Sequence, residues 1–69
     1  MYDVNMVGTK IREIRKAKKM TQQELADLID RERSVVVRYE QDAVDIPVSV
    51  LSAIARALKV KEAAFFGKN

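Results

Sequence analysis

The chain has 69 residues, no cysteine, no histidine and a net charge of +3, and 48% of its residues are hydrophobic. This length allows one domain, which buries only about 60% of the surface of its unfolded chain and therefore has a thin core. The composition is too apolar for a disordered protein, it excludes disulfides and thiolate metal sites, and no apolar run approaches the ~18 residues of a membrane span.

The first predicted helix covers residues 8–19. Three apolar side chains recur there, or just before it, at helical spacing: Val7, Ile11 and Ile14. Thr9, or Gly8 before it, is expected to cap the start of this helix. Residues 1–20 carry six basic and two acidic side chains. This basic run is either an ordinary solvated helix surface or a feature that attracts phosphate.

The sequence TQQE at residues 21–24 predicts the start of a second helix. A threonine followed three residues later by a glutamate forms a capping box, in which each side chain bonds the backbone N–H of the other residue. The helix that follows is expected to bury Leu25, Ala26 and Ile29. The polar run DRER then interrupts the apolar pattern, and we predict a tight turn at residues 30–32.

The sequence RERSVVVRYE at residues 31–40 raises three alternatives: a buried strand, a helical turn or an exposed apolar patch. A strand needs a partner, and no other segment of the chain alternates with a period of two. We therefore predict a helix over about residues 32–41, with Val36 facing the core and Tyr39 and Glu40 along its edge. The residues nearer to solvent are then Arg33, Ser34 and Arg38, and Val35 and Val37 flank the buried stripe.

The remaining residues predict a loop at 42–45 and two more helices. Pro47 suits the first position of a fourth helix. That helix has an apolar stripe with 3/4 spacing: Val48, Leu51, Ile54, Ala55 and Leu58. The segment KEAAFF predicts a short fifth helix. The result is an all-α chain with a domain over residues 8–66, an N-terminal extension at 1–7 and a tail at 67–69.

The order of these parts resembles the Cro/C1-type helix-turn-helix domain, also called the XRE family, from Gly8 to Phe66. The resemblance rests on four motifs: IREIR at 11–15, TQQELA at 21–26, VxRYE at 36–40 and LxxIAxALxV at 51–60. It implies a compact five-helix bundle of the lambda-repressor-like DNA-binding fold. Helices at about 22–28 and 33–41 would form the helix-turn-helix, with the second helix in the major groove of DNA.

The resemblance and the chemistry of the side chains predict six DNA-binding residues: Thr21, Gln22, Arg33, Ser34, Val35 and Arg38. Either arginine presents a planar fork that matches the edge of guanine and gives ~1–3 kcal/mol of base discrimination. Gln22 matches a position that contacts phosphate in the family. Thr21 caps its helix, contacts phosphate or does both. Val35 either packs on a thymine methyl or is a half-buried residue at the helix edge.

Other positions carry structural roles that the resemblance implies. Arg15 and Glu40 match a pair that often forms an ion pair between the first and third helices. Phe65 and Phe66 are expected at the interface of a homodimer, or in the core, or one in each place. The chain has Asp30 where the family usually has a glycine in the turn, and Asp tolerates left-handed backbone. It has Glu32 where the family usually caps the third helix with Ser or Thr, and a carboxylate there suits the helix dipole.

The function implied is that of a sequence-specific DNA-binding transcriptional regulator, a repressor that binds a palindromic operator as a homodimer. The alternative is an antitoxin-like or adaptor module that uses the same fold to bind another protein. An enzyme is disfavoured because the chain lacks His and Cys, and we expect no cofactor and no metal. Double-stranded DNA is the expected partner, with no membrane association. Because the N-terminus lacks the apolar stretch of a signal peptide, we expect a cytoplasmic, nucleoid-associated protein, either a stand-alone regulator or a fragment of a longer one.

Overall fold

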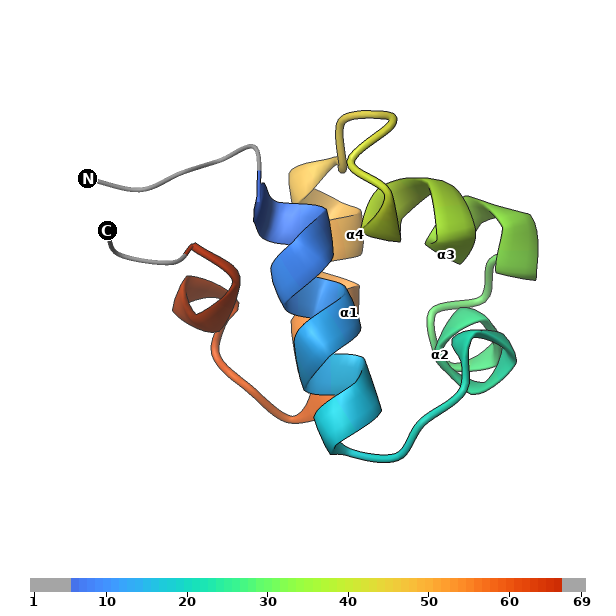
Figure 1. The fold of residues 1–69 in the computed structure, drawn as a ribbon, viewed down its shortest axis with the longest axis horizontal. Coiled ribbons are helices and arrows are strands. Elements are labelled where there is room, and N and C mark those ends of the chain that lie inside the picture. Colours follow the sequence, from blue (N-terminus) through green and yellow to red (C-terminus); the bar gives the residue numbers. More distant parts are fainter. Residues whose placement is uncertain (1–5, 67–69) are drawn as a thin grey trace.

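A computed structural model describes residues 6–66 of the chain. They form four α-helices and one 3-10 helix: α1 (Val7–Ala17), α2 (Gln22–Leu28), α3 (Arg33–Glu40), α4 (Val48–Leu58) and η2 (Glu62–Phe65) (Figure 1). These residues contain no strand, so the predicted all-α fold is confirmed. The predicted number of five α-helices is wrong, because the last element is a 3-10 turn of four residues. Residues 1–5 and 67–69, which include most of the predicted extension and all of the tail, lie outside the described residues.

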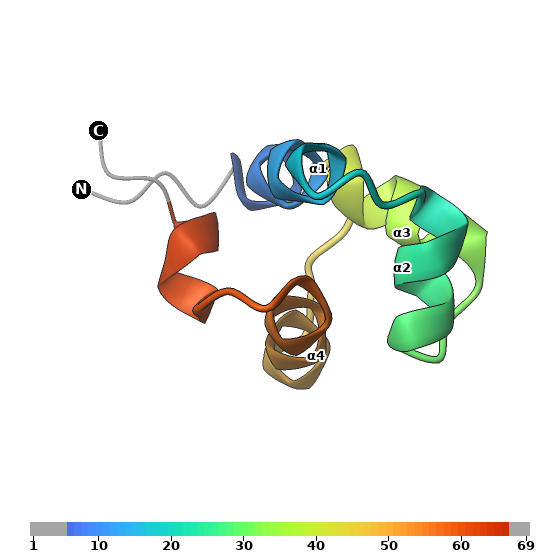
Figure 2. The ribbon, with the colours of Figure 1, turned by 90° about the horizontal axis from the view of Figure 1, so that it is seen from below.

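The helices pack around one core, with α1 and α4 in the middle of the molecule. The α2–α3 pair lies at one end of the long axis and η2 at the other (Figures 1 and 2). Every element contributes at least one fully buried apolar side chain: Ile11, Leu25, Val36, Ile54, Leu58 and Phe65. Burying a side chain of this size stabilises a fold by ~1.5–3 kcal/mol. No helix among residues 6–66 has the length and hydropathy needed to cross a membrane.

The three consecutive valines lie in a helix, and their orientation is as predicted. Val36 is 1% exposed, and Val35 and Val37 are half-buried on either side of it. Tyr39 and Glu40 were expected along the helix edge, but both are buried. The reason is that α1 packs against this end of α3, so the buried face of α3 is wider near its C-terminus than the apolar pattern indicates.

The first two helices begin in different ways. At α2 the predicted capping box is confirmed: the Glu24 N–H donates to Thr21 Oγ1 at 3.0 Å, and the Thr21 N–H donates to Glu24 Oε1 at 2.8 Å. The predicted cap of α1 is wrong, because the helix begins at Val7 and Gly8 and Thr9 lie inside its first turn.

The N-terminus of α1 is instead held by a side chain from a distant loop. Asp42 accepts hydrogen bonds from the Gly8 N–H at 2.8 Å and from Thr9 Oγ1 at 3.2 Å. A carboxylate at this position also interacts favourably with the helix dipole. Asp42 is 34 residues from Gly8, so a search for caps within one turn of the helix start cannot find it.

The start of α4 also differs from the prediction. Pro47 precedes the helix as its N-cap and is not its first residue. Val48, which was expected in the core, is 75% exposed, whereas Val50 is buried. Val50 lies four residues before Ile54 and eight before Leu58, so it continues the row of side chains that faces the core. Val48 extends a parallel row into the first turn, where it protrudes into solvent.

Candidate nucleic-acid interface

The α2–α3 pair is joined by a short turn whose backbone bends sharply. Asp30 has a φ of 58°, in the left-handed region, as expected from its place in the turn. The Arg31 N–H donates to the Ala26 carbonyl oxygen at 2.9 Å, which closes the end of α2. Glu32 then starts α3 in an extended conformation and makes no side-chain hydrogen bond to the helix. This turn sets α3 at an angle to α2 with its first residues pointing away from the core.

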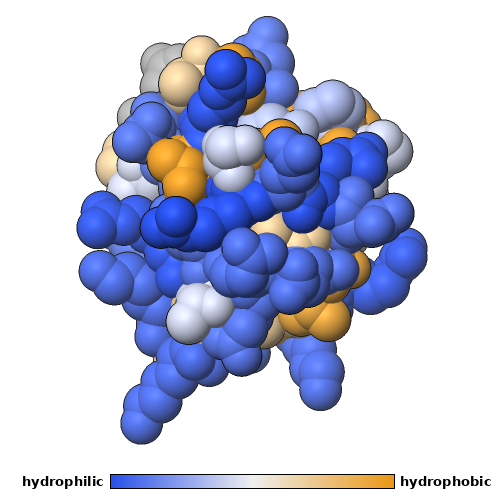
Figure 3. Space-filling view, turned by 90° about the vertical axis from the view of Figure 1, so that its right-hand side faces the viewer, coloured by the Kyte–Doolittle hydropathy of each residue, from blue (hydrophilic) through white to orange (hydrophobic). Residues whose placement is uncertain are grey.

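The predicted base-reading side chains lie at the surface. Arg33 and Ser34, in the first turn of α3, and Arg38, in its last turn, are all exposed. The face that carries α2 and α3 is mostly hydrophilic, with only small apolar areas (Figure 3). Val35 is half-buried and packs against the core, which accounts for its apolar character without DNA. A long exposed arginine above a polar face is a suitable donor for base edges or phosphates.

A buried ion pair anchors α3 to α1. Arg15 Nε and Nη2 donate to the two carboxylate oxygens of Glu40 at 2.5 and 3.0 Å, so the pair predicted by resemblance is present in a bidentate arrangement. The side chains are only 9% and 2% exposed. Arg15 Nη1 also donates to the Met20 carbonyl oxygen at 2.7 Å. These additional bonds offset part of the cost of removing both charges from water.

Gln22 connects this ion pair to the predicted recognition surface. Its Nε2 donates to Glu40 Oε1 at 3.1 Å, and its Oε1 accepts from Arg33 Nη2 at 3.4 Å. This orientation of the amide is the one that satisfies both neighbours, since Glu40 only accepts and Arg33 only donates. A continuous series of polar contacts therefore runs from the core to Arg33. The family resemblance implied a phosphate contact for Gln22 and did not reveal this second role.

The basic residues of the run at 10–19, in α1 and just after it, differ in their surroundings. Lys10 lies near Glu13 at 3.9 Å on the exposed surface and forms a weak pair. Lys16 and Lys19 instead line a shallow groove of about 480 Å³ at the start of α2. The same groove is lined by the predicted DNA-binding residues Thr21, Gln22 and Arg33. Only the turn between α1 and α2 brings these two lysines beside Arg33, so the linear charge pattern could not distinguish them from the rest of the run.

The two C-terminal phenylalanines have different environments. Phe65 is fully buried and fills the core between α1 and α4, so it offers no surface to a second copy, as in the alternative that places one phenylalanine in the core. Phe66 is half-buried and packs at the edge of the core. Alternation of the two side chains about a short 3-10 turn sends one inward and leaves the other at the surface.

Comparisons with known proteins identify the arrangement. A family model described as helix-turn-helix matches residues 11–65. The immunity repressor protein of Bacillus phage phi105 is 37% identical over 63 residues, which cover 91% of this chain but only 44% of that protein. The chain thus spans less than half the length of this relative.

Two solved structures have similar folds. The restriction-modification controller protein C.AhdI from Aeromonas hydrophila is 30% identical, with a TM-score of 0.87 over 93% of this chain and 97% of the controller. The P22 c2 repressor, solved in complex with synthetic operator 9T, is 20% identical, with a TM-score of 0.83 over 93% of this chain and 97% of the repressor, and this similarity concerns the fold alone. The family match covers most of the chain and includes the whole α2–α3 unit. The chain therefore belongs to the Cro/C1-type helix-turn-helix family of transcriptional regulators, the XRE family.

Proposed function

We propose that the chain reads a palindromic DNA operator as a homodimer and represses transcription there, with α3 inserted in the major groove. The observation that carries this proposal is the exposed start of α3, where Arg33 and Ser34 face solvent and Arg33 is joined through Gln22 to the buried ion pair. The likeness to a phage immunity repressor and to a restriction-modification controller supports it. Such a protein acts in the cytoplasm, at the nucleoid.

The groove at the start of α2 is suited to the phosphate backbone. Lys16, Lys19 and Arg33 supply three positive charges around it, and Thr21 and Gln22 supply polar side chains. Phosphate contacts of this kind fix the orientation of a protein on the duplex and account for most of the salt dependence of binding. Gln22 then has two tasks, to face the phosphate and to hold the Arg33 guanidinium.

Sequence discrimination falls to the side chains that α3 presents outward. Arg33 and Arg38 are suited to guanine edges, and Ser34 is suited to any base that offers a donor or acceptor. Val35 is half-buried, so only part of its side chain is available to a thymine methyl. Because α3 is short and its base is fixed to α1, all of these contacts depend on one rigid element.

The test begins with selection of bound duplexes from a random pool, followed by fluorescence-anisotropy titration of the selected site and of an unrelated duplex. Arg33→Ala is expected to lose about 5- to 150-fold in affinity for the selected site, which corresponds to ~1–3 kcal/mol of base discrimination. Its affinity for the unrelated duplex should fall much less. Arg56→Ala, which removes an exposed positive charge from α4, is the matched control.

Equal binding by wild type and Arg33→Ala on every duplex would refute base reading by this residue. A pull-down that recovers a stoichiometric protein partner, with no retention of DNA by the wild-type chain, would favour an adaptor or antitoxin-like role for the same fold.

A further inference from the structure

Val35 and Val37 flank the buried Val36 on α3, but they have different neighbours. Both are half-buried, and Val35 packs against the core cluster, whereas Val37 is not among the described residues that do so. Val37 instead lines a hollow of about 460 Å³ between α1 and α3. The other residues that line this hollow are all polar: Thr9, Arg12, Gln22, Glu40, Gln41 and Asp42. An apolar side chain therefore borders a polar hollow on the helix that is proposed to enter DNA.

Neither helix propensity nor core packing accounts for a valine at residue 37. β-Branched side chains lose rotamer freedom in a helix and are poorer helix formers than Ala, Lys, Gln or Glu. At Val36 this cost is offset by burial in the core, where the side chain is 1% exposed. At Val37 the compensation is smaller, and a polar residue would suit the surroundings better. A residue that disagrees with its local surroundings in this way indicates a functional contact.

Val37 lies on the same surface of α3 as the side chains that are proposed to read bases. It follows Arg33 by four residues and Ser34 by three, so the three side chains are neighbours on successive turns of the helix. Arg33 and Ser34 are exposed, and so is Arg38, the residue after Val37. A major groove that receives Arg33 and Ser34 would therefore bring base edges to Val37 as well.

The chemistry of a valine side chain selects one base. In the major groove thymine presents an apolar group, its C5-methyl, whereas the other bases present hydrogen-bond donors and acceptors, with which a valine cannot pair. We propose that Val37 is a specificity-determining residue that reads a thymine in each half-site by packing on its C5-methyl group. This inference rests on the DNA reading of the proposed function and names one base that α3 selects.

The acidic groups around the hollow are compensated within the protein. Glu40 is paired with Arg15, and Asp42 accepts from the Gly8 N–H at the positive end of the α1 dipole. Arg12 is exposed on α1 and lines the same hollow, so it supplies a positive charge beside Val37. This charge is suited to the phosphates that flank the thymine.

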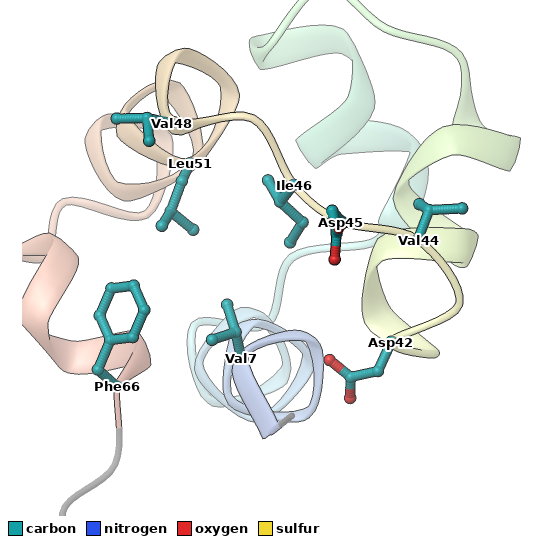
Figure 4. Close-up of a pocket in the computed structure, with 8 residues that line it drawn as sticks. All are labelled: Val7, Asp42, Val44, Asp45, Ile46, Val48, Leu51 and Phe66. Atoms are coloured by element: carbon teal, nitrogen blue, oxygen red, sulfur yellow. The ribbon is translucent and has the colours of Figure 1, made fainter. Parts of the chain in front are cut away.

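The most exposed valines of α4 and of the loop before it lie around a second hollow. Val44 is 45% exposed and Val48 is 75% exposed, and both line this hollow of about 400 Å³ near the start of α1 (Figure 4). Asp42 and Asp45 also line it, and none of the described residues around it is basic. The second hollow is therefore unsuited to DNA, and Val44 can serve as a control valine outside the recognition helix.

Replacement of single thymines by deoxyuridine in the selected duplex removes only the C5-methyl group, and fluorescence anisotropy measures its effect. We expect the wild type to lose about fourfold in affinity when one particular thymine of a half-site is replaced, which is the worth of one apolar methyl contact. For Val37→Ala, affinity for the unmodified duplex should fall by a similar factor, and replacement of that thymine should then have no effect. Because residue 37 lies outside the core cluster and alanine is a good helix former, the thermal stability of Val37→Ala should be close to that of the wild type.

Val35→Ala and Val44→Ala are the matched controls. Val35→Ala should lower the thermal stability, because Val35 packs against the core, but should keep the wild-type ratio of affinities for the thymine and deoxyuridine duplexes. Val44→Ala should change neither the stability nor this ratio.

A selected half-site without thymine, or deoxyuridine duplexes that the wild type and Val37→Ala bind with the same relative affinities, would overturn the proposal. If the inference alone fails, the wild type still prefers the selected duplex, and this preference depends on Arg33 but not on Val37. If the proposed function fails as well, the wild type prefers no duplex over another and Arg33→Ala changes nothing.

Discussion

At its C-terminal end, α3 is tied to α1 by a bidentate buried ion pair and by the Asp42 side chain that holds the first turn of α1. At its N-terminal end, the helix starts at Glu32 without a side-chain cap, and Arg33 and Ser34 extend into solvent. Gln22 lies between these ends and bonds to both, donating to Glu40 and accepting from Arg33. One helix thus has a firmly fixed base and an open tip.

The C-terminal end of α3 serves the stability of the fold, whereas the N-terminal end is free for recognition. Arg15 and Glu40, at the base of α3, are buried and hydrogen-bonded to each other, so changing either one leaves its partner unsatisfied in the core. Groups at the tip are exposed, and their change alters little of the fold. A rigid base fixes the backbone of α3 that carries the exposed Arg33 before DNA arrives, which reduces the entropy lost on binding.

The largest expected effect is at the base of the helix. Glu40→Ala leaves the Arg15 guanidinium buried without its counter-ion, which should lower the free energy of unfolding by ~3–5 kcal/mol. Urea denaturation followed by circular dichroism measures this loss. Glu13→Ala, which removes the exposed pair with Lys10, should cost less than ~1 kcal/mol and is the control. Similar losses for the two variants would show that the base is not the fixed end of α3.

A substitution at Gly8 tests how closely α1 approaches the end of α3. A Cβ at this position would lie 2.0 Å from the Tyr39 carbonyl oxygen and 2.7 Å from Asp42 Oδ1, and a backbone carbonyl cannot rotate away. Gly8→Ala should therefore destabilise the fold by ~1–3 kcal/mol.

Whether Gly8→Ala lowers or raises the stability of the fold decides how close the two helices are. In an open helix, replacing glycine by alanine stabilises the fold by up to ~1 kcal/mol. Thr9→Ala, in the same turn, loses only one hydrogen bond to Asp42, and its cost of ~0.5–1.5 kcal/mol provides a scale for the comparison. A Gly8→Ala variant with raised thermal stability would mean that α1 and α3 are farther apart than the structure places them.

The smallest expected effect is at the tip. Glu32→Ser supplies a hydroxyl cap to α3, whose N-cap residue already has a suitable extended backbone, and should raise the free energy of unfolding by ~0.5–1 kcal/mol. Loss of a negative charge near the phosphates should also strengthen DNA binding. Glu32→Ala removes the charge but adds no cap, so it separates the two effects. Equal thermal stability of the Ser and Ala variants would argue against any capping at this position.

Much of the fold could be predicted because its signals are local. The capping box joins Thr21 to Glu24, three residues away, and the apolar spacing that buries Val36 is read within one or two helical turns. The Arg15–Glu40 ion pair, which joins distant residues, could be predicted only from the resemblance to a known family. The burial of an apolar side chain could not be predicted where it depends on which part of the chain packs against it. Val48 and Phe65 are both apolar, yet Val48 protrudes into solvent and Phe65 fills the core.

The sequence by itself determined the helical segments, the turn at Asp30 and the exposed arginines of α3, because residues within a few positions of each other set backbone preference and helix face. The tertiary structure alone decided that Asp42 caps α1, that Gln22 links Glu40 to Arg33 and that Lys16 and Lys19 lie beside the recognition helix. It also decided where the exposed valines gather. These contacts join residues that are far apart in the chain, and their partners are set by how the helices pack, which no local pattern encodes.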